Sequence, residues 1–258
     1  MIAPFVKRAW RTGRKYYGVL LAIGLALTVL LAFIFAAALY TVTPASLERE
    51  AAALGIPLEV AYRNFKALFL LLFSTVAGLM ASTTAALVAG GSIQADMRNG
   101  VYEMLFGNGV PPAELARALL ATALSAAAAF YLFAVALVAA VALLTAPEAI
   151  AILPALALAA LASVVSGAVL IVAVGLAKPN TFKIATGIGT AKELAYTIAL
   201  APPTALMLAT IPFLHTVDLH TATAVISIIS IAMIAGSIGL LTATPRLVNK
   251  EELITQAE

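Results

Sequence analysis

The sequence predicts an all-α membrane protein, and three observations lead to this fold class. Hydrophobic residues make up 63% of the 258 residues, and charged residues only 10%. The mean hydropathy of +1.08 leaves too little polar surface to coat a water-soluble globule. The apolar residues also form runs of about 20 residues or more, and a helix of that length matches a hydrocarbon layer of about 30 Å. We therefore expect one multi-pass transmembrane domain over residues 1–258.

Residues 1–16 precede the first apolar run and have the pattern of an amphipathic helix. Ile2, Phe5, Trp10 and other apolar residues recur at helical spacing, and basic residues occupy the other face. We expect this helix to lie at the membrane interface with Trp10 as its anchor. A simple retention signal, in which the charges hold the N-terminus in the cytoplasm, is compatible with the same residues.

Six apolar runs are long enough to be membrane-spanning helices. Their approximate ranges are 17–42, 67–93, 118–145, 149–177, 194–214 and 221–244. Basic residues concentrate in cytoplasmic segments of membrane proteins. With a cytoplasmic N-terminus, all 15 basic residues fall inside except Arg49, Arg63 and Lys66. An even number of spans then also places the tail, residues 245–258, in the cytoplasm.

Residues 43–66 form the largest predicted external segment. Pro44, Gly55 and Pro57 interrupt it. Ser46, followed by an Arg-Glu pair, predicts a capped external helix of a few turns between these breaks. A lid over a pathway and a solvated connector are both open interpretations of this segment.

Small residues recur in the second and fourth predicted spans, as Gly78, Ser82, Ser163, Ser166 and Gly167. Small side chains let helix backbones approach closely in lipid, where no hydrophobic effect drives association. We therefore interpret them as helix-packing positions. No internal repeat is visible, so the sequence does not favour an inverted-repeat carrier.

Residues 94–117 are the one long polar interruption in the middle of the chain. Charged and apolar residues alternate there at a spacing that suits a short helix at the membrane surface, with one face offered to a partner. Gly107, Gly109 and the Pro111-Pro112 pair are expected to end this helix. The residues predicted to bind the partner are Asp96, Arg98, Asn99, Gly100, Glu103, Met104, Leu105 and Phe106.

Three prolines, Pro202, Pro203 and Pro212, fall in the fifth predicted span. They are expected to interrupt its helix, and the freed carbonyls would need partners from the protein or from water in a cavity. The prolines are therefore candidates for a gate or pathway, with a structural kink as an equal alternative. A second interpretation starts this span near Thr181 and makes the piece after Pro203 re-entrant.

His215, Asp218 and His220 are the candidates for a metal site, at the outer mouth before the last span. Imidazole and carboxylate groups at short spacing can bind a transition metal. Three polar residues in a loop are more often only solvated, so no metal is expected. The chain has no cysteine, which excludes disulfides and thiolate ligands.

The predicted spans contain no ionisable residue well inside them. Proton-coupled carriers need such groups as relays, and an intramembrane hydrolase needs a nucleophile with its base or metal ligands. A Walker A motif is also absent, because Lys192 is followed by Glu193 rather than Ser or Thr. This chain is therefore not predicted to be an enzyme, and energy for transport would come from another subunit.

The central segment DMRNGVYEMLFGNGVPPAEL resembles the cytoplasmic segment of type-2 ABC exporter permeases. The residues that carry the resemblance are Asp96, Arg98, Gly100, Glu103, Leu105, Phe106, Val110 and Leu115. The segment departs from the family pattern at Val101, Tyr102 and Gly109, and its prolines are displaced to Pro111 and Pro112. Six spans, cytoplasmic termini, a basic amphipathic N-terminal helix and a broken fifth helix are also similar to this family.

The resemblance implies a multi-pass subunit of the plasma membrane. It would pair with a second permease subunit, identical or related, and with two ATP-binding cassette subunits that bind ATP and Mg²⁺. The family's coupling helix corresponds to residues near 96–106. An amphipathic or lipid-like cargo would leave the cytoplasm, membrane lipids would be further partners, and neither a cofactor in this chain nor nucleic acid is expected. A non-transporting scaffold and a sodium-coupled carrier using the Pro202 break are the alternatives.

Overall fold

The chain is built from helices in the computed structural model, which describes residues 2–179, 190–216 and 218–254. They are α1 (Ile2–Thr41), α2 (Glu48–Leu54), α3 (Leu58–Arg98), α4 (Val101–Gly107), α5 (Pro112–Thr145), α6 (Leu153–Ala177), α7 (Thr190–Thr216), α8 (Leu219–Leu247) and α9 (Lys250–Ile254). Short 3-10 helices, η1 (Pro44–Leu47) and η2 (Pro147–Ile152), join some of them. Because no strand occurs in these ranges, the all-α prediction is confirmed for them.

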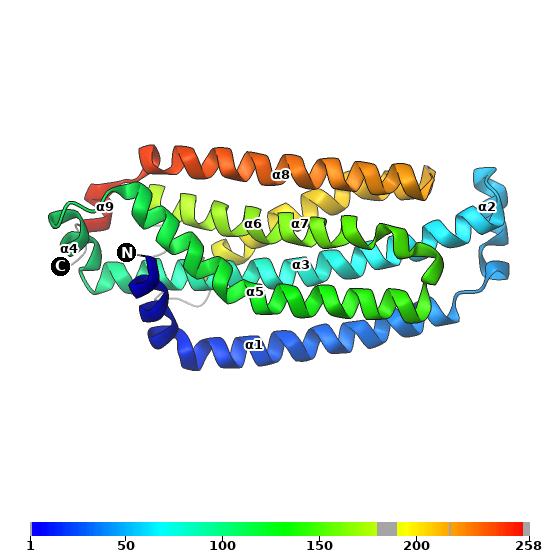
Figure 1. Cartoon of the computed structure of the whole chain (residues 1–258), viewed down its shortest axis with the longest axis horizontal. Coiled ribbons are helices and arrows are strands. Elements are labelled where there is room, and N and C mark those ends of the chain that lie inside the picture. Colours follow the sequence, from blue (N-terminus) through cyan, green and yellow to red (C-terminus); the bar gives the residue numbers. More distant parts are fainter. Residues whose placement is uncertain (1, 180–189, 217, 255–258) are drawn as a thin grey trace.

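The long helices α1, α3, α5, α6, α7 and α8 lie side by side in one bundle (Figure 1). Five stretches in the described residues are long and apolar enough to cross a membrane: Leu21–Thr41, Leu58–Arg98, Pro112–Thr145, Pro147–Ala177 and Leu219–Leu247. The apolar stretch described in α7, Thr197–Ile211, is shorter. These are the helices of a multi-pass membrane protein, and the sixth span stays a prediction.

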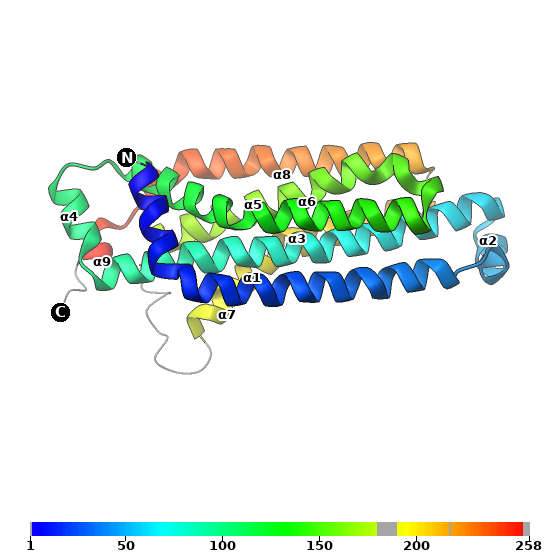
Figure 2. The ribbon, with the colours of Figure 1, turned by 60° about the horizontal axis from the view of Figure 1, so that its bottom comes forward.

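The two ends of the bundle carry different short helices. The start of α1, α4 and α9 lie at one end, here called the α4 end, and α2 lies at the other, here called the α2 end (Figure 1). The first turns of α1 lie at an angle to the rest of that helix, across the α4 end (Figure 2). This placement suits the predicted interfacial helix over residues 1–16, whose amphipathic face lies outside the described side chains.

The short helix α2 confirms that residues 43–66 contain a helix but not its predicted cap, and the external position of this helix stays a prediction. Leu47 is the N-cap residue of α2 and makes no side-chain cap bond. The Ser46 hydroxyl instead donates to the Thr43 carbonyl, 2.6 Å away, in the preceding 3-10 turn. The cap prediction is wrong because this extra turn shifts the start of α2 past Ser46.

Helices α3 and α6 form the centre of the bundle. In the most apolar stretch of each helix, 56% of the residues of α3 and 67% of those of α6 are buried. The corresponding shares are 11% for α1 and 17% for α8. A methyl group built on Gly78 of α3 would lie 3.2 Å from the Cα of Ala160 on α6. This close approach of two backbones favours a glycine and confirms the packing role predicted for Gly78.

The predicted helix break in the fifth span is wrong, because α7 is helical through Pro202, Pro203 and Pro212. A proline at position 203 removes the N–H that would bond the Ala199 carbonyl, four residues earlier. The Ser82 hydroxyl on α3 donates to that carbonyl instead, at 3.1 Å. A neighbouring helix therefore satisfies the freed group, as membrane helices commonly do. Pro202 and Pro203 are buried, and a pathway role for the prolines stays a prediction.

Candidate partner-binding site at the α4 end

A glycine turn separates α3 from α4. Gly100 has a φ of 62°, in the left-handed region, and its N–H donates to the Met97 carbonyl at 3.1 Å. A left-handed glycine just past the last turn is a common way to stop a helix. The predicted single helix over residues 96–106 is therefore wrong, since Asp96 and Arg98 belong to the last turns of α3 and Glu103 to α4.

Helix α4 has one buried face and one exposed face. Val101 and Tyr102 are buried, and the Tyr102 ring stacks near that of Phe106 at a centroid distance of 6.4 Å. Glu103 and Met104 lie on the exposed face. The buried face anchors α4 to the bundle, and the exposed face is open to a partner.

The end of α4 follows the prediction from its glycines and prolines. Gly109 has a φ of 74°, and the N–H of Val110 donates to the Leu105 carbonyl at 3.0 Å. Pro111 is the N-cap residue of α5. The stop signals at Gly109 and Pro111 are therefore confirmed, and the chain passes from α3 through α4 to α5 by two short turns.

The C-terminal helix α9 packs against α4, which sequence reasoning missed. The N–H of Asn249 donates to the Leu176 carbonyl of α6 at 3.0 Å, and Leu253 is only 2% exposed in the same core cluster as Tyr102. The Lys250 ammonium lies 5.6 Å from the centroid of the Phe106 ring. A sequence signal existed, because Asn249 followed by Glu252 matches a helix N-cap, and the Glu252 N–H does donate to Asn249 Oδ1 at 3.2 Å.

The predicted partner-binding residues are brought to one end of the bundle but are not equally accessible. Arg98, Asn99, Glu103 and Met104 are exposed, and Gly100, Leu105 and Phe106 are partly buried. Asp96 is only 7% exposed. A partner that docks here would therefore touch the exposed four first, while Asp96 is buried in the last turns of α3.

Replacing Gly100 by Val is expected to destabilise the α3–α4 turn by roughly 1–2 kcal/mol, the cost of the left-handed conformation for a residue with a side chain. Crowding is not the cause, since a Cβ at position 100 would meet only Glu103 Oε2, at 3.9 Å. Gly100→Asn is the matched control, because Asn tolerates this conformation. Protease cleavage between residues 99 and 110 of the detergent-solubilised chain should increase with Val and not with Asn, and equal cleavage would contradict the argument.

One of the three candidate metal residues, Asp218, has a structural task at the start of α8. Asp218 Oδ1 accepts hydrogen bonds from the N–H groups of His220 and Thr221, at 2.9 and 3.0 Å. Its Oδ2 accepts one from the Thr221 hydroxyl at 2.8 Å. The bonds from Thr221 are the main reason that the pKa of Asp218 lies below its usual value. Asp218 is therefore an N-cap of α8, while the side chain of His215 lies outside the described residues.

An ion pair between a buried lysine and a partly exposed glutamate at the α2 end was also missed. The second span was predicted to begin at residue 67, but α3 begins at Leu58 and buries Lys66. The Lys66 ammonium lies 2.7 Å from Glu148 Oε1 and donates to the Thr145 carbonyl at 2.8 Å. A sequence signal existed here too, because the predicted spans leave Lys66 and Glu148 in loops on the same side of the membrane.

Comparison with known proteins identifies no relative of this chain. No family model matches the chain, and no curated protein or solved structure is significantly similar to it. The resemblance to the ABC exporter permeases therefore rests on residues 96–115 and on the predicted arrangement of spans and ends, without the broken fifth helix, which is wrong.

Proposed function

We propose that this chain is the transmembrane permease subunit of an ATP-driven exporter of the ABC type. In this proposal six spans cross the plasma membrane, and the α4 end faces the cytoplasm. Two ATP-binding cassette subunits hold ATP and Mg²⁺, and a second permease subunit, identical or related, completes the assembly. The cargo is an amphipathic or lipid-like molecule.

The observation that carries the proposal is the construction of α4. This helix is joined to α3 and α5, two of the candidate membrane-spanning helices, by short turns at Gly100 and Gly109. Within α4, Tyr102 is fully buried on the face towards the bundle, and Glu103 and Met104 are exposed on the other face. A force on the exposed face therefore passes directly to two membrane helices. That is what a coupling helix has to do when the energy comes from another subunit.

The placement of the chain ends supports the same orientation. The start of α1 and helix α9 lie at the α4 end (Figure 1). With a cytoplasmic N-terminus, three basic residues are expected outside. They lie in α2 and at the start of α3, towards the α2 end: Arg49, Arg63 and Lys66. A cytoplasmic α4 end therefore agrees with the positive-inside rule.

The proposal is tested by charge changes at exposed residues of the α4 end. The chain is purified from its native membranes with the ATPase that accompanies it, and the complex is reconstituted in liposomes. Glu103→Ala and Arg98→Glu should each lower ATP turnover and co-purification of the ATPase by about five- to tenfold, the loss of roughly 1 kcal/mol of interface contacts. Glu50→Ala and Arg49→Glu are matched controls, because these residues are exposed on α2 at the opposite end.

Three results would count against the proposal. Equal co-purification and turnover in the α4-end and α2-end variants would mean that α4 is not the contact. ATP turnover without movement of any amphipathic dye or lipid would favour the scaffold. Movement that follows a sodium gradient and ignores ATP would favour the secondary carrier.

A further inference from the structure

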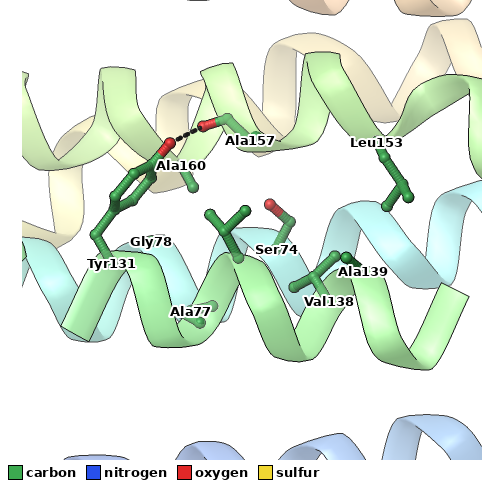
Figure 3. Close-up of a pocket in the computed structure, with 11 residues that line it drawn as sticks. Ser74, Ala77, Gly78, Tyr131, Val138, Ala139, Leu153, Ala157 and Ala160 are labelled. Atoms are coloured by element: carbon green, nitrogen blue, oxygen red, sulfur yellow. Dashed lines mark hydrogen bonds between the residues drawn. The ribbon is translucent and has the colours of Figure 1, made fainter. Parts of the chain in front are cut away.

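Helices α3, α5 and α6 enclose a pocket between them (Figure 3). Its floor is α3, with Ser74, Ala77 and Gly78, and its walls come from α5 and α6. The space measures about 350 Å³, its open mouth included. On α5 the lining runs from Tyr131 to Ala139, about 12 Å along the helix at 1.5 Å per residue. The pocket is thus a slot parallel to the bundle axis.

The walls of this slot are almost entirely apolar. Its two lining hydroxyl groups are already engaged, since Ser74 donates to the Leu156 carbonyl at 2.9 Å and Tyr131 to the Ala157 carbonyl at 3.1 Å. Figure 3 shows the second of these bonds spanning α5 and α6. A buried water needs two to four polar partners. Both hydroxyl protons are used, so the slot offers a water no side-chain donor and only the hydroxyl oxygens as side-chain acceptors. Water is therefore a poor occupant.

The mouth of the slot lies between α5 and α6. The floor residues Ser74, Ala77 and Gly78 are buried, while Val135 and Ala139 on α5 and other wall residues are partly exposed. All three helices belong to the candidate membrane-spanning stretches. Helices of this length and composition are expected to lie in the membrane, so the mouth is expected to face hydrocarbon. An unfilled void beside it would forfeit the dispersion contacts of its lining.

We propose that this slot binds one acyl chain of a membrane phospholipid, lying parallel to the helices. The width left by alanines and a glycine suits an unbranched chain, and the slot has no free donor or charge for a headgroup, which stays outside the mouth. The inference does not depend on the exporter proposal, because it concerns the resting bundle without nucleotide or partner.

The experiment uses the full chain in nanodiscs of phosphatidylcholine. The probe is a phosphatidylcholine with a diazirine at the end of one acyl chain, present at low mole fraction. After irradiation, peptide mass spectrometry gives the ratio of adducts on the slot walls to adducts on the exposed face of α8, which reports ordinary lipid contact. In the natural sequence this ratio should be well above one.

Two neighbouring alanines on α5 provide the matched pair. Ala139 lines the slot and Ala140 is exposed outside it. Ala139→Phe should lower the adduct ratio by about fivefold, which corresponds to losing roughly ten close carbon contacts. Ala140→Phe should leave the ratio unchanged. Leu153→Ala, which widens one end of the slot, should raise it and carries the test if Ala139→Phe does not fold.

The alternatives give different results. Equal labelling of the slot and the α8 face, or the same ratio in the Ala139 and Ala140 variants, would overturn the proposal. Protection of the slot in nanodiscs that hold two copies of the chain, with labelling in those that hold one, would assign it to a second copy and would also overturn it. Because the labelling experiment needs neither nucleotide nor partner, a failure of ATP-dependent transport would not change the labelling ratio.

Discussion

Replacing Gly167 by Ala is expected to lower the free energy of unfolding by about 2 kcal/mol. A methyl group at this position would clash with Ser82 Oγ and would lie 3.3 Å from Ser82 Cβ. The Ser82 hydroxyl would have to turn away and release the Ala199 carbonyl, to which it donates at 3.1 Å. Pro203 cannot supply the missing N–H. A buried carbonyl without a donor costs about 1–3 kcal/mol.

A set of combined variants tests this mechanism through unfolding of the chain in mixed detergent micelles. Gly167→Ala should cost less in a Ser82→Ala background, where the clashing hydroxyl is already gone. Ser82→Ala should in turn cost less in a Pro203→Ala background, because an N–H at position 203 can bond Ala199 again. Gly91→Ala is the control, since nothing lies within 4 Å of a Cβ there. Strictly additive costs would refute the shared cause.

Glu148→Ala is expected to destabilise the bundle by about 1–2 kcal/mol, and by more than Lys66→Met. Lys66 is only 6% exposed. Without Glu148, its ammonium keeps two partners, the Thr145 carbonyl and the Tyr62 ring, whose centroid is 4.4 Å away. Breaking a buried pair costs about 3–5 kcal/mol when one charge is stranded. Glu148 is 31% exposed, so solvent reduces the effect to the lower figure.

The same unfolding measurement checks this order. Lys66→Met removes the charge and keeps the aliphatic stem, so its cost should be small. The double variant Lys66→Met, Glu148→Gln should resemble Lys66→Met, because no buried charge remains. A larger loss in Lys66→Met than in Glu148→Ala would show that the lysine contributes mainly through packing and its bond to Thr145.

Composition and local pattern predicted much of the fold. The apolar runs predicted the helices of the bundle. Gly109 and Pro111 predicted the end of α4, and Gly78 predicted a close helix contact. These signals are local, because they depend on propensity, hydropathy and the conformational freedom of single residues.

What the sequence did not reveal depends on contacts between distant residues. Helix α7 tolerates Pro203 because Ser82, 117 residues from Ala199, donates to the carbonyl that this proline leaves without its N–H partner. Lys66 is tolerated in α3 because Glu148 reaches it from the turn after α5. Helix α9 has an N-cap signal, but its position depends on Leu253 entering the core cluster of Tyr102. None of these pairings can be read from residues near either partner.

The contact between α9 and α4 joins two parts of the molecule that lie far apart along the polypeptide. Since Leu253 and Tyr102 belong to one hydrophobic core cluster, we expect a rearrangement that tilts α4 to move α9 with it. Because the chain has no cysteine, spin labels attached through cysteines at positions 250 and 108 would test this without background signal. A constant distance between the labels during ATP turnover is the expected result.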